Sequence, residues 1–326
     1  MQRHIASLRS STRNHPRRRA VWLVGLVTAG MAVTAVANEG LQDSLPPITG
    51  IHEVADNLYL LANSETEDQS AWTGGNTAVW ITNDGVVLVD TKLAGYGQAI
   101  LERVREVTDK PVTTIINTHT HFDHAGSNTE FPDSVSIVTH ENTATQMARA
   151  ECSPVTGCDA FKGENRRYLP DQTYADRLSL FSGRDRVDLY HFGRGHTNGD
   201  TLVVFPAVGT MHTGDLFPWR GLPFVDVEGS GGSAVDYGAT LNKAVAGISG
   251  VETVNTGHND TTVAWSDFEE FADFYNHLAD AAREGLYAGR SAEETAADYT
   301  LPDRFRGYDA EPETVLSIMQ HIHAGR

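Results

Sequence analysis

The feature that most constrains the fold of this 326-residue chain is a cluster of potential metal ligands after one predicted strand. Residues 112–117 are rich in β-branched side chains and predict a buried strand that leads directly into Thr118. Imidazole and carboxylate groups both bind zinc, and a tight loop can direct alternate side chains to two neighbouring metals. The sequence therefore predicts a metal centre at this strand end, with four candidate ligands within six residues: His119, His121, Asp123 and His124.

Three further side chains of the same kind follow predicted strands, and a glycine precedes each of them. They are His196, in a Gly-rich turn, Asp215 and His258. Alone, a histidine in such a turn or an aspartate after a glycine is more often a structural turn residue. Their order and shared context, together with the cluster at 119–124, favour one metal site built from several strand ends.

The rest of the sequence alternates between β-rich and helical segments. The run Asn83–Gly85 separates two short β-rich segments and predicts a hairpin turn. No low-complexity linker follows residue 37, so we expect a single α/β domain over residues 38–326 with its site where strands end. Strands are expected at 79–82, 86–89, 112–117, 187–192, 202–205, 211–213 and 251–255, and helices at 96–107, after 140, at 237–248 and at 265–287.

Residues 1–37 have the organisation of a secretory signal peptide. Three consecutive arginines, Arg17–Arg19, precede an apolar run that ends in the small-residue pattern Ala35-Val36-Ala37. This pattern predicts cleavage after Ala37 and a periplasmic or secreted mature protein. An uncleaved membrane anchor is the alternative. The arginines leave open whether export uses the general or the twin-arginine route.

The charge distribution limits the partners of the chain. Residues 1–37 carry six arginines and no acidic residue, so the formal net charge of −18 becomes −24 on the remainder. Because a surface this acidic repels phosphate backbones, we exclude nucleic acid and expect a small-molecule substrate. No apolar run after residue 40 is long enough to span a bilayer, so we expect no membrane association after signal cleavage. The sequence leaves the oligomeric state open.

The chain has two cysteines, Cys152 and Cys158, which enclose the turn-forming sequence Ser-Pro-Val-Thr-Gly. An exported protein meets an oxidising environment, so we expect a small local disulfide, with two free thiols as the alternative. A lone cysteine pair without matching histidine spacing does not predict a zinc site.

The ligand pattern resembles that of the metallo-β-lactamase superfamily. The HxHxDH motif of this family matches residues 119–124, later family motifs match the three downstream candidates, and the resemblance covers essentially the whole mature chain. It implies an αββα four-layer sandwich with two zinc ions held between the sheets. By this resemblance the first metal is bound by His119, His121 and His196, the second by Asp123, His124 and His258, with Asp215 bridging both and Asp90 steadying the ligand loop.

The resemblance also implies a reaction. Two zinc ions that share a water lower its pKa, so that hydroxide can attack a carbonyl carbon near neutral pH. Asp123 would be the catalytic residue, because it both binds a metal and orients the nucleophile. The favoured function is an exported dinuclear zinc hydrolase, β-lactamase-like in the broad sense, that acts on a cyclic amide or ester.

Departures from subfamily patterns leave the substrate open. Asp215 stands where the best-known zinc β-lactamases have cysteine, and in this it resembles glyoxalase II enzymes and lactonases. The alternatives are a thioester hydrolase of the glyoxalase II type, a persulfide dioxygenase with one iron, and a non-catalytic metal-binding accessory protein. Export and the lack of a basic tail disfavour a glutathione thioester.

Substrate contacts are less well defined. Arg220, shortly after the bridging aspartate, could receive a substrate carboxylate, although a surface ion pair fits its position equally well. Trp72 could form a wall of the pocket or simply pack in its loop. We expect His321 and His323, near the C-terminus, to belong to a solvated tail.

Overall fold

The β-rich segments form two sheets in the computed structural model, which describes residues 45–62 and 71–326. The predicted signal peptide, residues 1–37, lies outside the described residues. Within residues 45–62 and 71–326, no helix is both long enough and apolar enough to cross a bilayer.

The first sheet contains the N-terminal strands in chain order. Its β3 and β4 form the antiparallel hairpin that Asn83–Gly85 predicts, with Ile81 opposite Val86. From β4 to β7 the strands are parallel, so their carboxyl ends meet at one edge. The strands are β1 (His52–Ala55), β2 (Leu58–Leu61), β3 (Thr77–Ile81), β4 (Val86–Val89), β5 (Val112–Ile116), β6 (Ser136–His140) and β7 (Gln172–Tyr174).

The second sheet contains the C-terminal strands in the order β13-β12-β11-β10-β9-β8. Its β11 and β12 are parallel, and their carboxyl ends precede Asp215 and His258. The strands are β8 (Arg177–Leu180), β9 (Val187–Tyr190), β10 (Leu202–Phe205), β11 (Thr210–His212), β12 (Thr253–Asn255) and β13 (Val263–Ala264).

Alternating side chains pack the two sheets against each other. In β4, Val87 and Val89 belong to the same buried cluster as Val203 and Phe205 of β10. The intervening Leu88 packs in a different cluster, together with residues of α2. Because successive side chains of a strand point to opposite faces, each sheet has one face on its partner and one face on helices.

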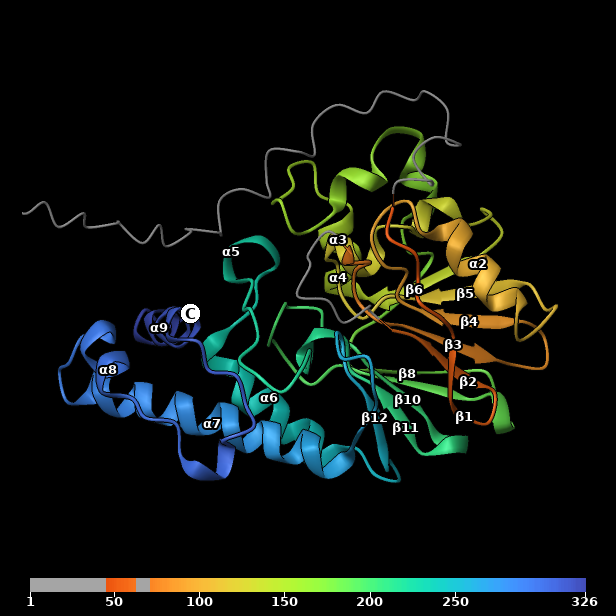
Figure 1. Cartoon of the computed structure of the whole chain (residues 1–326). Coiled ribbons are helices and arrows are strands. Elements are labelled where there is room, and N and C mark those ends of the chain that lie inside the picture. The colour runs from red at the N-terminus through yellow and green to blue at the C-terminus, as the bar shows by residue number, and fades with distance from the viewer. Residues whose placement is uncertain (1–44, 63–70) are drawn as a thin grey trace, which may run out of the picture. The chain divides into compact units, whose positions relative to one another are not determined.

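Helices cover the outer face of each sheet, which gives the expected αββα order (Figure 1). On the first sheet, α2 buries Ile100 and Val104. On the second sheet, α6, α7 and α9 form a larger cluster rich in aromatic side chains. The helices are α2 (Gly97–Arg105), α3 (Phe122–Ala125), α4 (Glu141–Met147), α5 (Val227–Ser230), α6 (Ala234–Gly247), α7 (Trp265–Tyr287), α8 (Ala292–Asp298) and α9 (Pro312–His323).

The prediction of a solvated C-terminal tail is wrong. His321 and His323 lie in the last turn of α9, and Ile322 between them is buried in the helical cluster. The ring of His323 contacts the carbonyl of Ala282 in α7 through Nε2, at 2.9 Å. The apolar face of α9 therefore packs on α7 rather than ending in solvent.

Candidate metal centre

The HxHxDH residues lie in the loop after β5 and in the short helix α3 that follows it, and Asp90, directly after β4, fixes the start of this segment. The Asp90 carboxylate accepts hydrogen bonds from the backbone N–H of Thr118 at 2.8 Å and from its hydroxyl at 2.7 Å. Its Oδ2 also lies 2.7 Å from Nδ1 of His124. Asp90 is fully buried and has a φ of 64°, a backbone conformation uncommon outside glycine. The structure thus places Asp90 behind the ligand loop, where the sequence analysis expected it.

Three histidines bring one ring nitrogen each to a common point. Nε2 of His196 lies 3.2 Å from Nε2 of His119 and 2.9 Å from Nδ1 of His121. All three side chains are buried. They form the first donor group, and its members come from the loop after β5 and the loop after β9.

The outer nitrogen of each ring is held by a hydrogen-bond acceptor. The Thr118 hydroxyl already donates its proton to Asp90, so it accepts from Nδ1 of His119 at 2.9 Å. Similarly, His121 Nε2 lies 3.1 Å from Oδ2 of Asp226, and His196 Nδ1 lies 2.7 Å from the carbonyl of Phe224. With their protons directed outward, the three inner nitrogens face one another as lone pairs.

A second donor group combines Asp123, His124 and His258. His124 Nε2 lies 3.4 Å from Asp123 Oδ2 and 3.4 Å from His258 Nε2. Asp215 stands between the two groups. Its carboxylate lies 3.2 Å from Nε2 of both His124 and His258, and 3.7 Å from Nε2 of His196. The sequence-predicted ligands are therefore all gathered in one place.

The buried carboxylates and imidazoles of this cluster shift one another's pKa values. Burial alone would lower the pKa of His124, but Asp215, Asp123 and Asp90 together raise it well above its ordinary value. Conversely, burial and the neighbouring histidines hold the pKa of His119 well below its usual range. His196 has its pKa lowered to about 4 by burial and by His121. His119 and His196 are therefore neutral donors at neutral pH.

These residues fit a pair of metal ions. Three inward lone pairs at about 3 Å repel one another unless a cation lies between them, and carboxylates buried beside them also require positive charge. The donors of a tetrahedral zinc site, each about 2.0–2.1 Å from the ion, lie about 3.3 Å apart. The separations in this centre, from 2.9 to 3.7 Å, are close to this value. Nitrogen and oxygen donors also accord with zinc.

A cavity of about 380 Å³ opens over both donor groups. Trp72 lines this cavity, which is the first of the two roles that its sequence position suggested. Its ring stacks on that of His258, with centroids 6.2 Å apart. Phe224, 54% exposed, lies over the first group with its ring 6.3 Å from that of His121. The remaining wall residues are Phe122, Val155 and Trp219.

Arg220 does not line this cavity. Its guanidinium forms an ion pair with Asp267 at the start of α7. The side chain is 44% exposed, so the surface ion pair is the arrangement that the structure adopts. Among the described residues, the cavity wall contains no lysine or arginine.

Several residues of the site escaped the sequence analysis. Asp226 caps α5 by accepting from Gly229 N–H, and the same carboxylate holds His121. Lys92 is fully buried and donates to the carbonyls of Ala62 and Gly75, and burial lowers its pKa to about 7. No local motif marks either residue, because each meets the site through a long-range contact. A single sequence also gives no sign that a lysine shortly after a strand, such as Lys92, has a buried side chain.

The fold and the donor groups define an αββα protein with candidate sites for metal ions. Comparison with protein families makes the class specific. Residues 71–248 match the metallo-beta-lactamase superfamily, and the chain belongs to that superfamily.

Two curated proteins are similar to this chain in sequence. The chain is 26% identical over 167 residues to metallo-beta-lactamase type 2 of Elizabethkingia meningoseptica, covering 49% of this chain and 59% of that protein. It is 27% identical over 199 residues to 2,4-dinitroanisole O-demethylase subunit alpha of Nocardioides sp. (strain JS1661), covering 58% and 55%. The chain thus spans less than two thirds of the length of these relatives.

Solved structures show the same fold. A metallo-beta-lactamase from Pontibacter korlensis superposes with a TM-score of 0.56 at 18% identity, covering 69% of this chain and 98% of that one. The sec-alkylsulfatase Pisa1 from Pseudomonas sp. superposes with a TM-score of 0.63 at 16% identity, covering 83% and 49%. At these identities the likeness supports the αββα architecture alone.

Proposed function

We propose that this protein is a dinuclear zinc hydrolase acting on a cyclic amide or ester. The observation that carries the proposal is the direction of the ring protons in the first donor group. Each outer nitrogen has an acceptor, so the inner nitrogens of His119, His121 and His196 meet as lone pairs. Such an arrangement is stable only around a cation. Asp215 lies between this group and the second one, which supports a shared pair of ions.

When bound at these donor groups, zinc would lower the pKa of a bound water and polarise a substrate carbonyl. Among the described residues, Asp123 and Asp215 are the carboxylates that line the cavity. Burial opposes ionisation of Asp123, but His124 and His258 lower the pKa of Asp123 below its ordinary value. The carboxylate is therefore charged at neutral pH and can orient the attacking water by accepting its hydrogen bond. The aromatic walls hold the substrate against the centre and exclude bulk water.

The substrate class is the less constrained part of the proposal. The similar proteins named above are a β-lactamase, an O-demethylase for 2,4-dinitroanisole and an alkylsulfatase. The wall is mostly apolar and aromatic, which suits a compact acyl compound with an apolar body. We therefore place lactams, lactones and other esters ahead of thioesters and sulfur compounds.

Hydrolysis of a chromogenic cephalosporin and of an aryl lactone by the zinc-loaded protein tests this function. Turnover of either compound that stops with a chelator and returns with zinc supports the proposal. A zinc-loaded protein that turns over neither compound, nor a simple aryl ester, would contradict hydrolysis. Iron-dependent oxygen consumption with a persulfide would favour the dioxygenase alternative instead.

We also propose that the protein acts outside the cytoplasm. Support comes from the Arg17–Arg19 segment and the apolar run before Ala37, and from the Cys152–Cys158 disulfide, which suits an oxidising compartment. N-terminal sequencing of the protein from a periplasmic fraction should begin at Asn38. An intact N-terminus in the membrane fraction would favour an uncleaved anchor.

A further inference from the structure

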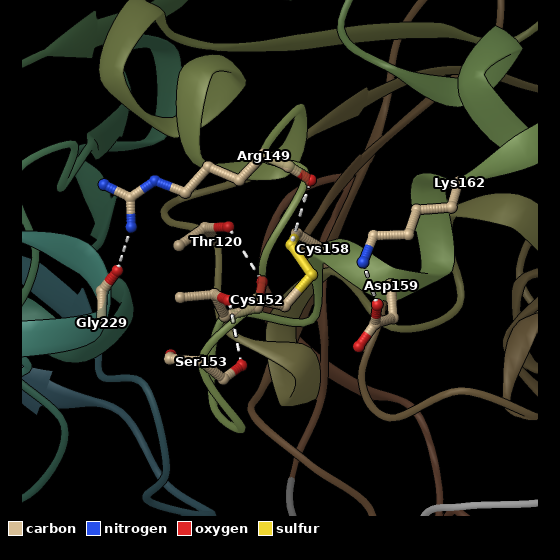
Figure 2. Close-up of a disulfide and its surroundings, with 9 residues drawn as sticks. Thr120, Arg149, Cys152, Ser153, Cys158, Asp159, Lys162 and Gly229 are labelled. Carbon is tan, nitrogen blue, oxygen red and sulfur yellow. Dashed lines mark hydrogen bonds and ion pairs between the residues drawn. A yellow bond between two sulfur atoms is a disulfide. The ribbon is translucent and has the colours of Figure 1, made fainter.

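The loop closed by the disulfide lies directly behind a candidate metal ligand. Cys152 and Cys158 are bonded, with Cα atoms 5.6 Å apart, as the sequence analysis expected. Figure 2 shows this bond beside Thr120, the residue that precedes His121. Cys158 is fully buried, so the loop packs into the protein rather than projecting from it.

Two hydrogen bonds connect the loop to the residues on either side of His121. The hydroxyl of Thr120 donates to the carbonyl of Thr156 at 3.1 Å. The backbone N–H of Phe122 donates to the carbonyl of Val155 at 3.0 Å. Both acceptors lie inside the loop that the disulfide closes. The main chain before and after this ligand is therefore held from one short segment.

The same loop also approaches the carboxylate that holds the ring of His121. The Ser153 hydroxyl lies so close to Gly229 that a Cβ built on this glycine would come within 2.4 Å of it. Gly229 N–H in turn donates to Asp226, at 2.8 Å. Just before the loop, the guanidinium of Arg149 donates to the carbonyl of Gly229, a contact that Figure 2 shows spanning the two segments.

Without the disulfide, little within the loop would preserve this arrangement. The loop contains one glycine in the left-handed region, Gly157 at φ 60°, and one internal turn in which Thr156 N–H and hydroxyl donate to Ser153 carbonyl. Short irregular segments with few internal hydrogen bonds are mobile unless something constrains their ends. A covalent bond between Cys152 and Cys158 supplies that constraint.

We propose that the Cys152–Cys158 disulfide is a positioning element of the first metal group. It fixes the loop that orients His121 through Thr120, Phe122 and the Asp226 cap, and it holds Val155 in the cavity wall. In the second group, Asp90 holds His124, and His258 lies in the loop after β12, so two of its three ligands are positioned by segments other than the disulfide loop. The inference rests on the proposed metal centre but on no particular substrate.

Zinc titration against a chromophoric chelator tests the inference, because it needs no catalytic activity. Two double alanine variants serve as backgrounds, and each leaves only one donor group complete. Asp123→Ala with His258→Ala leaves only the first group complete, and His119→Ala with His196→Ala leaves only the second. In the first background, Cys152→Ala with Cys158→Ala should weaken zinc binding roughly tenfold, the size typical of losing an outer support of a ligand. In the second background, the same replacement should change affinity less than about twofold, within the scatter of such comparisons.

Two further variants keep the test decisive. Thr120→Val removes one of the two hydrogen bonds while the disulfide stays intact, so it should also weaken zinc binding by the first group. It replaces the cysteine double variant as the test if that variant does not fold. Val315→Ala, at a buried position of α9 far from the donor groups in sequence, should lower thermal stability without selective loss of zinc at either group. Equal loss in both backgrounds, or no loss in either, would overturn the inference alone. Failure of both backgrounds to bind zinc would overturn the metal centre as well.

Discussion

Two glycines set how closely the backbone approaches the candidate ligands. A Cβ on Gly75 would lie 2.2 Å from the ring of His124, and one on Gly257 would lie 2.1 Å from Oδ1 of Asp215. Neither glycine has a positive φ, so space rather than backbone conformation requires the missing side chain. The glycines that precede or face the ligands are thus part of the site.

Replacing Gly75 by alanine should displace the ring of His124. We expect the Gly75→Ala protein to remain folded but to hold about one zinc ion fewer than the wild-type protein, because a methyl group cannot share the space of the ring. Elemental analysis after dialysis measures the loss. Gly307→Ala is the matched control, since its new Cβ would meet its nearest neighbour at 3.9 Å. Unchanged zinc content in Gly75→Ala would show that His124 is not a ligand.

At the scale of elements, hydrophobic patterning predicted much of the architecture. The apolar stripe of α7 predicted its bounds, Trp265–Tyr287, and the turn signal at Asn83–Gly85 predicted the β3–β4 hairpin. By contrast, β7 has three residues, two of them exposed, and the polar-apolar alternation of β8 covers only four residues, so neither sequence is long enough to predict a strand. The strand predicted at 187–192 ends earlier, at Tyr190, where His191 turns its ring to the carbonyl of Asp200.

The candidate site likewise contains some residues that the sequence predicts and others that it does not. The ligands were predictable because chemistry requires their residue types at short spacing, with glycines beside them. Their outer partners were not. Asp226 is 105 residues from His121, and its role depends on how α5 folds over the ligand loop. Phe224 acts through its backbone carbonyl, which any residue type could supply. Such contacts follow from the tertiary fold rather than from local sequence.

The helical layer under the second sheet should contribute stability without shaping the metal centre. Phe274 of α7 is fully buried and packs on Phe305 and Tyr308, with ring centroids 5.5 and 4.5 Å away. Phe274→Ala should therefore lower the free energy of unfolding by about 3–5 kcal/mol. Urea unfolding measures this loss, and zinc titration of the folded variant should give wild-type affinity. A selective loss of one zinc ion would contradict this separation of core and site.

At the scale of the whole molecule, a pair of histidines outside the centre should limit stability in acid. The rings of His140 and His191 stack with centroids 3.9 Å apart. Nδ1 of His140 accepts the N–H of Asn142 at the start of α4, and its Nε2 donates to the carbonyl of Ala175. Burial, and then the neighbouring His191, lower the pKa of His140 to about 4. The folded protein therefore favours the neutral ring.

Because the unfolded chain binds this proton more readily, with an ordinary histidine pKa of about 6.5, stability is retained above that pH and lost as pH falls toward 4. The loss from His140 is at most about 1.4 kcal/mol per pH unit. His140→Asn keeps an acceptor for the helix start but cannot titrate, so its stability should fall less steeply over this range. Urea unfolding of the metal-free proteins between pH 7 and pH 4 measures the two slopes. Equal slopes would show that His140 is not responsible.

We propose above all that this chain builds a centre for two metal ions from residues at the ends of its strands. The most direct test is the zinc content of the purified protein after equilibration with zinc and dialysis, compared with His196→Ala and His258→Ala. We expect two zinc ions per chain in the wild-type protein and about one in each variant, because each replacement removes a ligand from a different group. A wild-type protein that retains no zinc, or variants that retain as much as the wild type, would contradict the claim.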